Sequence, residues 1–138
     1  MSWDSYIDNV IAHSKMGETP QIDKAAIIGQ NGALWTSHAH ANALKLSAEE
    51  ALVIGSAFAK NDMSILQANG LMIEGKKYQF LRGDDEVINL KLKEHGSITC
   101  AASSTAVVVC HCIEGGQLGQ VNVAANVIAD YTLKMTKV

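Results

Sequence analysis

Residues 2–11 (SWDSYIDNVI) decide the fold expected for this chain, because their pattern is that of an amphipathic helix. Ser2 suits the N-cap position, and Asp4 places a negative charge in the first turn, where the helix dipole favours it. The apolar side chains that recur at helical spacing are Trp3, Ile7, Val10 and Ile11. We therefore expect the chain to begin with a helix that packs its apolar face on the remaining elements.

Two aromatic rings stand at the edge of this helix. Trp3 and Tyr6 are three residues apart, so their rings are neighbours on the helix surface. Both rings could be ordinary core residues, which is the common role of large apolar side chains. Alternatively, they form an aromatic platform that is half packed against the protein and half open to a ligand.

Length and composition favour one compact domain over residues 1–138, with 48% hydrophobic and 18% charged residues. The net charge is −3 and no run of Lys and Arg could follow a phosphate backbone, so nucleic acid is not an expected partner. No apolar stretch reaches the length of about 18 residues that a transmembrane helix needs. The three cysteines, an odd number, suit a reducing compartment, and we expect a cytoplasmic protein.

The middle of the chain predicts a hairpin, a helix and then a series of antiparallel strands. Residues 24–30 and 33–37 are the expected hairpin strands, because the dipeptide Asn31-Gly32 favours a two-residue turn. Residues 47–50 (SAEE) form a capping box that opens the helix. Further short strands are expected at 64–68, 71–73, 77–82, 87–93, 97–102 and 105–112, before a loop at 114–119 and a last helix. This order predicts an α+β domain with helices packed on an antiparallel sheet.

The search for catalytic or metal-binding groups is largely negative. There is no glycine-rich phosphate loop, so no nucleotide cofactor is expected. In the run 110–112 (CHC), a strand would point the two cysteines to one face and the histidine to the other, which prevents them from converging on one metal ion. His38 and His40 could share a face, but two ligands fall short of the usual three or four. Cys100 lacks the local signature of a catalytic cysteine. We expect no catalytic residue, no metal and no cofactor.

The placement of the aromatic residues is more informative. Trp3 and Tyr6 lie on the first helix, Tyr131 lies on the last helix, and Trp35 lies on an early strand. If the terminal helices pack side by side over that strand, the four rings form a shallow groove. Such a groove suits a polyproline II ligand, which is already extended and offers free carbonyl groups.

At this point the sequence resembles a known family. Residues 1–9 (MSWDSYIDN) are similar to the opening of the profilins, which are small actin-monomer-binding proteins. Other segments agree in order: residues 25–29 with Trp35 downstream, 69–71, 77–82, and 119–122, which open the last helix that reaches 130–131. The resemblance extends over essentially the whole chain.

The resemblance implies a central antiparallel β-sheet with the N- and C-terminal helices on one face and smaller helices on the other. It also implies binding of monomeric actin at its barbed-end face, regulation of polymerisation, promotion of nucleotide exchange on actin, and binding of proline-rich proteins. The proline-binding residues implied by position are Trp3, Tyr6, Trp35, Tyr131 and Met135. The implied actin-binding residues are Lys77, Phe80, Arg82, Lys91, Lys93, Gln117, Gly119, Asn122 and Asn126.

Some residues fit this assignment better than others. Lys91 and Lys93 would share one face of the expected strand, as suits an acidic partner such as actin, although lysines there could simply keep a sheet face soluble. Val123 and Val127 stand where some profilins carry polar or charged groups. The family also binds phosphoinositides through basic patches, and so few basic residues predict weak binding.

A different class of function stays open beside this one. A small-molecule sensor or enzyme could use a similar α+β scaffold, with the histidines and Cys100 as its reactive groups. Such a function would require a deep pocket lined by titratable residues with perturbed pKa values.

Overall fold

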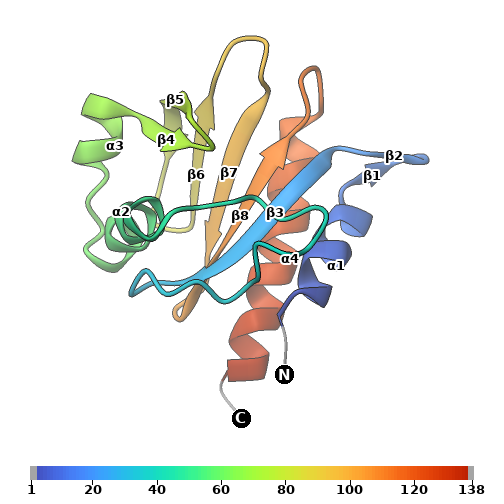
Figure 1. Ribbon diagram of the computed structural model, residues 1–138, viewed down its shortest axis with the longest axis horizontal. Coiled ribbons are helices and arrows are strands. Elements are labelled where there is room, and N and C mark those ends of the chain that lie inside the picture. Colours follow the sequence, from blue (N-terminus) through green and yellow to red (C-terminus); the bar gives the residue numbers. More distant parts are fainter. Residues whose placement is uncertain (1–2, 137–138) are drawn as a thin grey trace.

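A six-stranded antiparallel sheet forms the centre of the molecule, with strand order β3-β8-β7-β6-β5-β4 (Figure 1). The computed structural model describes residues 3–136, with side chains up to residue 133. The strands are β3 Ile22–Gly29, β4 Leu71–Ile73, β5 Lys76–Gly83, β6 Val87–Lys91, β7 Ser97–Ala102 and β8 Ala106–Cys112. A separate small hairpin pairs β1 Lys15–Met16 with β2 Thr19–Pro20.

Helices cover both faces of the sheet and bury one apolar core on each. Helices α1 (Ser5–His13) and α4 (Leu118–Thr136) pack on β3, β7 and β8 from one side. Helices α2 (Ala48–Ala59) and α3 (Ser64–Asn69) cover the other side (Figure 1). The fold implied by the resemblance is therefore confirmed, with the terminal helices on one face.

Strand β8 shows how the alternation of side chains builds both cores. Val108, Cys110 and Cys112 face α1 and α4, whereas Val107 and Val109 face α2 and α3. Because the strand is buried on both sides, its sequence is a continuous apolar run. The prediction that the cysteines of residues 110–112 point away from the intervening histidine is confirmed.

Residues 64–68, predicted as a strand, are helical. They belong to α3, whose one buried residue is Leu66 and whose following residue, Gly70, has a φ of +67°. A short apolar run with a single buried position fits either a strand or a helical turn, and its neighbours decide between them. Here Asp62 Oδ1 accepts the Ser64 N–H at 2.9 Å and helps to begin the helix.

The expected partner strand at residues 33–37 is reduced to a single bridge between Ile28 and Leu34. Beyond it, the N–H groups of Trp35 and Thr36 both point to the Ile27 carbonyl oxygen, and Thr36 Oγ1 accepts the Ile27 N–H. The side chain of Thr36 therefore replaces a strand partner, and the chain turns away from the sheet edge.

The two helix starts proposed from the sequence have different outcomes. The capping box of α2 is confirmed, with Ser47 Oγ accepting the Glu50 N–H at 3.1 Å and Glu50 Oε1 accepting the Ser47 N–H at 3.0 Å. Helix α1 begins at Ser5, with Asp4 at the cap position but without a side-chain cap. Ser2, the predicted cap, lies outside the described residues.

Candidate functional site

Three aromatic rings meet where α1 approaches the segment after β3. The ring centroids of Trp3 and Tyr6 are 5.1 Å apart in an edge-on arrangement, and those of Trp3 and Trp35 are 4.9 Å apart. Trp3 and Trp35 are half-buried, whereas Tyr6 is only 9% exposed. Tyr6 is therefore a core residue, whereas the two indoles pack on the edge of the core and stay partly exposed.

The fourth ring belongs to the neighbouring helix. Tyr131 lies near the end of α4, which packs beside α1, and its side chain is 46% exposed. The start of α1 and the end of α4 lie on the same side of the molecule in Figure 1. The side chain of Met135, the remaining proline-binding candidate, lies outside the described part of the chain.

Polar contacts hold the Trp35 segment against α1. Asp4 Oδ1 accepts the Ser37 N–H at 2.7 Å. His40 donates from Nε2 to Asp8 Oδ1 at 3.1 Å, while its Nδ1 accepts the Asn42 N–H. The carboxylates on the polar side of α1 therefore act as anchors that bring the loop, and Trp35 with it, to the helix.

Glycine at position 29 makes room for the indole. A Cβ atom built on Gly29 would lie 3.0 Å from Trp35 Nε1, which is closer than ordinary van der Waals contact. The absence of a side chain lets the ring lie close to the end of β3.

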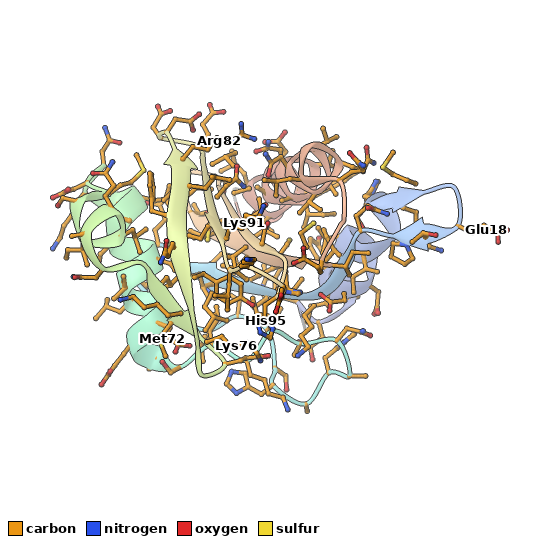
Figure 2. All side chains as sticks on the ribbon, turned by 90° about the horizontal axis from the view of Figure 1, so that it is seen from above. Glu18, Met72, Lys76, Arg82, Lys91 and His95 are labelled. Carbon is orange, nitrogen blue, oxygen red and sulfur yellow. The ribbon has the colours of Figure 1, made fainter. Side chains whose placement is uncertain are left out.

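The actin-binding candidates fall on the part of the sheet that α4 leaves open. Lys77 and Arg82 are exposed near opposite ends of β5, and Lys91 is exposed on the neighbouring β6; Figure 2 labels Arg82 and Lys91. Helix α4 and the loop before it contribute Gln117, Gly119, Asn122 and Asn126. Of these residues, Arg82, Asn122 and Asn126 line one recess.

The structure places two further candidates differently from the sequence prediction. The prediction that Lys91 and Lys93 lie on one strand face is wrong, because β6 ends at Lys91 and Lys93 is in the turn to β7. Phe80 packs on the α2 and α3 core, since the register shift between Phe80 and Arg82 sends the two side chains to opposite sides of the sheet.

Exposed apolar side chains on this open face were not among the candidates. Met72 pairs with Lys77 and is exposed, and Leu81 lines a recess of about 220 Å³ together with Lys91. Val123 is exposed on α4. Leu81 owes its exposed position to the bulge in β5, and the regular alternation of a strand does not predict such a bulge.

A separate cavity of about 230 Å³ lies at the end of the sheet near His95 and Lys76 (Figure 2). At its wall, His111 Nδ1 lies 2.6 Å from Asp23 Oδ1, and its Nε2 lies 2.6 Å from the His95 carbonyl oxygen. Burial by itself lowers the pKa of His111, but these two hydrogen bonds outweigh it and raise the pKa above 6.5.

Cys100 cannot serve this cavity as a nucleophile. It is 1% exposed in the α2 and α3 core and is not among the residues that line the cavity, and burial raises the pKa of its thiol to about 12. The thiolate is the reactive form, so this cysteine is inert at neutral pH. Within residues 3–136, no helix is long and apolar enough to cross a membrane, and no cluster of His, Cys, Asp and Glu could hold a metal ion.

Comparison with known proteins gives a consistent result. The profilin family model matches residues 1–136. A profilin of Clypeaster japonicus is 49% identical over 134 residues, covering 95% of this chain and 96% of that protein. Among solved structures, profilin II of Acanthamoeba castellanii shares the fold with a TM-score of 0.80 at 24% identity, covering 98% of this chain and 99% of that one.

A second solved structure with the same fold is mouse profilin IIa in complex with a double repeat from the FH1 domain of mDia1. Its TM-score is 0.71 at 22% identity, and the match covers 99% of each chain. Together with the family match over nearly the whole chain, these likenesses establish that this protein belongs to the profilin family, whose members are actin-binding regulators and not enzymes.

Proposed function

We propose that this protein binds monomeric actin through its open sheet face and proline-rich proteins through the aromatic groove between its terminal helices. The observation that carries the proposal is the Trp3–Trp35 pair, two partly exposed indoles whose centroids lie 4.9 Å apart, together with the exposed ring of Tyr131 on the helix that packs against α1. A protein interior would cover such rings, whereas a polyproline II ligand packs on them and accepts hydrogen bonds from them.

The size of the groove predicts weak binding. If three rings each lose about 80 Å² of apolar surface, the gross gain is about 6 kcal/mol at roughly 25 cal/mol per Å². The ligand contributes a similar amount, and association costs about 4–15 kcal/mol. We expect a dissociation constant in the micromolar to millimolar range for one proline segment, with repeated segments raising the avidity.

The open face suits a protein partner with acidic groups. Among its exposed apolar residues, Met72 pairs with the basic residue Lys77, and Leu81 lines one recess with Lys91, while Val123 is exposed on α4. This combination of apolar anchors with a charged surround is typical of protein interfaces. Binding here would place this protein at the barbed-end face of actin, and nucleotide exchange would follow from preference for a more open actin conformation.

The remaining parts of the proposal concern the whole chain. We propose a single domain over residues 1–138, because the two cores share the strands of one sheet. We place the protein in the cytoplasm, in association with the cytoskeleton. Eleven Lys and Arg against fourteen Asp and Glu leave little basic surface, so binding to phosphoinositides should be weak.

The test of the groove is retention on immobilised poly-L-proline. Trp3→Ala should abolish or strongly reduce retention, because it removes the ring that contacts both Tyr6 and Trp35. Leu52→Ala, at an exposed apolar position on α2, is the matched control and should be retained like the unmodified protein. Unchanged retention of Trp3→Ala, with its thermal unfolding intact, would place the proline site elsewhere.

A further inference from the structure

A buried asparagine lies under the open face. Asn89 is on β6 and is only 2% exposed, and its side chain points toward α4. Buried amides require hydrogen-bond partners, because an unpaired donor or acceptor costs about 1–3 kcal/mol. The partners of Asn89 connect two of the candidate binding residues.

The amide of Asn89 joins three side chains from β5, β7 and α4. Its Nδ2 donates to Thr99 Oγ1 and to Asn122 Oδ1, each at 3.0 Å. Its Oδ1 accepts from Arg82 Nε at 3.2 Å and from Asn122 Nδ2 at 3.3 Å. Thr99 Oγ1 also donates to Asn122 Oδ1 at 3.0 Å, which closes the network.

This network requires an amide at position 89. The side chain must donate two hydrogen bonds and also accept two, and a carboxylate or an apolar group of similar size lacks one or both capacities. Asn89 therefore does more than fill space, because the network forms only with an amide side chain at this position.

The network forms part of a recess on the surface. The recess has a volume of about 400 Å³ and lies between the β5–β6 end of the sheet and α4. Its lining includes Arg82, Asp84, Val87, Asn89, Asn122 and Asn126. With Nε held by Asn89, the terminal nitrogens of Arg82 make no hydrogen bond to any residue that the structure describes. They remain available for a partner.

We propose that Asn89 is a positioning residue for actin binding, which fixes the directions of Arg82 and Asn122 at this recess. The inference rests on the proposed function of the open face. An unrestrained arginine loses rotamer freedom when it binds, and a guanidinium already held in place loses less. Asn89 contributes to affinity through these two residues without touching the partner.

The test is a double-mutant cycle on binding to actin monomers, measured by fluorescence. Arg82→Ala and Asn89→Ala should each weaken binding about tenfold, which is about 1.4 kcal/mol. In the double variant, binding should be weakened clearly less than about 100-fold, which is the product of the two single effects, because Asn89 acts through Arg82. Independent effects that multiply would overturn the proposal.

Thermal unfolding and a control variant separate positioning from general stability. Val109→Ala removes buried apolar volume in the α2 and α3 core, away from the network, and should lower thermal stability while keeping actin affinity. If Val109→Ala loses affinity as Asn89→Ala does, binding simply follows stability and the proposal is wrong.

Actin binding by the unmodified protein separates a failure of the proposed function from a failure of the positioning role of Asn89. If it fails to bind actin monomers, the proposed function is wrong and the role of Asn89 falls with it. If it binds, and Asn89→Ala binds equally well, only the positioning role is overturned.

Discussion

His111 presents both of its ring nitrogens to groups that only accept hydrogen bonds. One is the carboxylate of Asp23 on β3, and the other is the carbonyl of His95 in the β6–β7 turn. Both bonds form only when both nitrogens carry hydrogen, so this geometry favours the imidazolium form. The pKa of Asp23, which burial would raise, is lowered by its hydrogen bond with His111. The other ionisable groups around this cavity are Lys24, Glu74, Lys76, Tyr78, Glu94, His95 and Glu114.

This geometry predicts a pH-dependent contribution of His111 to stability. Because folding raises its pKa above 6.5, the stabilisation is fully present below that pH and is lost as the pH rises through the folded-state pKa. Thermal unfolding should be measured between about pH 5 and about pH 9 for His111→Gln and the unmodified protein. The variant should be the less stable of the two at acidic pH, and the difference in stability should shrink as the pH rises. A difference between the two proteins that stays constant across this range would contradict the imidazolium assignment. Glu18→Gln, on the exposed β1–β2 hairpin, serves as the control.

At the scale of elements, the residues that begin and end a helix determine its position to different degrees. The capping box at Ser47 opens α2 as its sequence indicates. Helix α3 carries no comparable side-chain cap and ends at Gly70, where an added Cβ would overlap the Tyr78 carbonyl oxygen of the neighbouring strand. The position of α3 is therefore set by its contact with β5.

The cap of α2 gives a direct prediction. Ser47→Ala should lower the free energy of unfolding by about 1 kcal/mol, because the Glu50 N–H loses its acceptor. Urea denaturation would measure this loss, and the slope of the unfolding free energy against urea concentration should be the same for both proteins. Ser5→Ala, at an exposed helical position in α1, should change stability by less than about 0.5 kcal/mol. An equal loss in both variants would mean that the cap contributes nothing specific.

Across the whole molecule, α4 connects the two proposed sites. Its first half contributes Asn122 and Asn126 to the recess beside Arg82, while Tyr131 lies near its other end, and the helix as a whole packs against α1 (Figure 1). Actin and a proline-rich segment would therefore occupy different surfaces, and both could bind at once. Binding of one ligand should leave the other site accessible.

Charge reversal tests this separation. Lys91→Glu should weaken actin-monomer binding several-fold through unfavourable charge on the open face, while retention on poly-L-proline stays unchanged. Lys93→Glu should have a smaller effect, because Lys93 lies in the turn beyond β6. Lys60→Glu makes the same charge change on the far side of the sheet and is the control. Loss of both activities in Lys91→Glu would instead indicate a disturbed fold.

The sequence by itself determined those features that depend on local periodicity. The β-branched run in 105–112 predicted a central strand with its two cysteines on one side, and residues 47–50 predicted the start of α2; the structure confirms both. The opening residues also indicated the family, because their identity and spacing are a local signature. Such features can be predicted without knowing which element packs against the residues concerned.

Only the tertiary structure decided how individual side chains of the candidate sites are used. It buried Tyr6 and left Trp3 partly exposed, it separated Phe80 from Arg82 through a bulge, and it placed Asn89 beneath the open face. Exposure and pairing depend on the element that packs across from a residue. That contact joins positions far apart in the chain, as between Asn89 and Asn122, so local patterns carry no record of it.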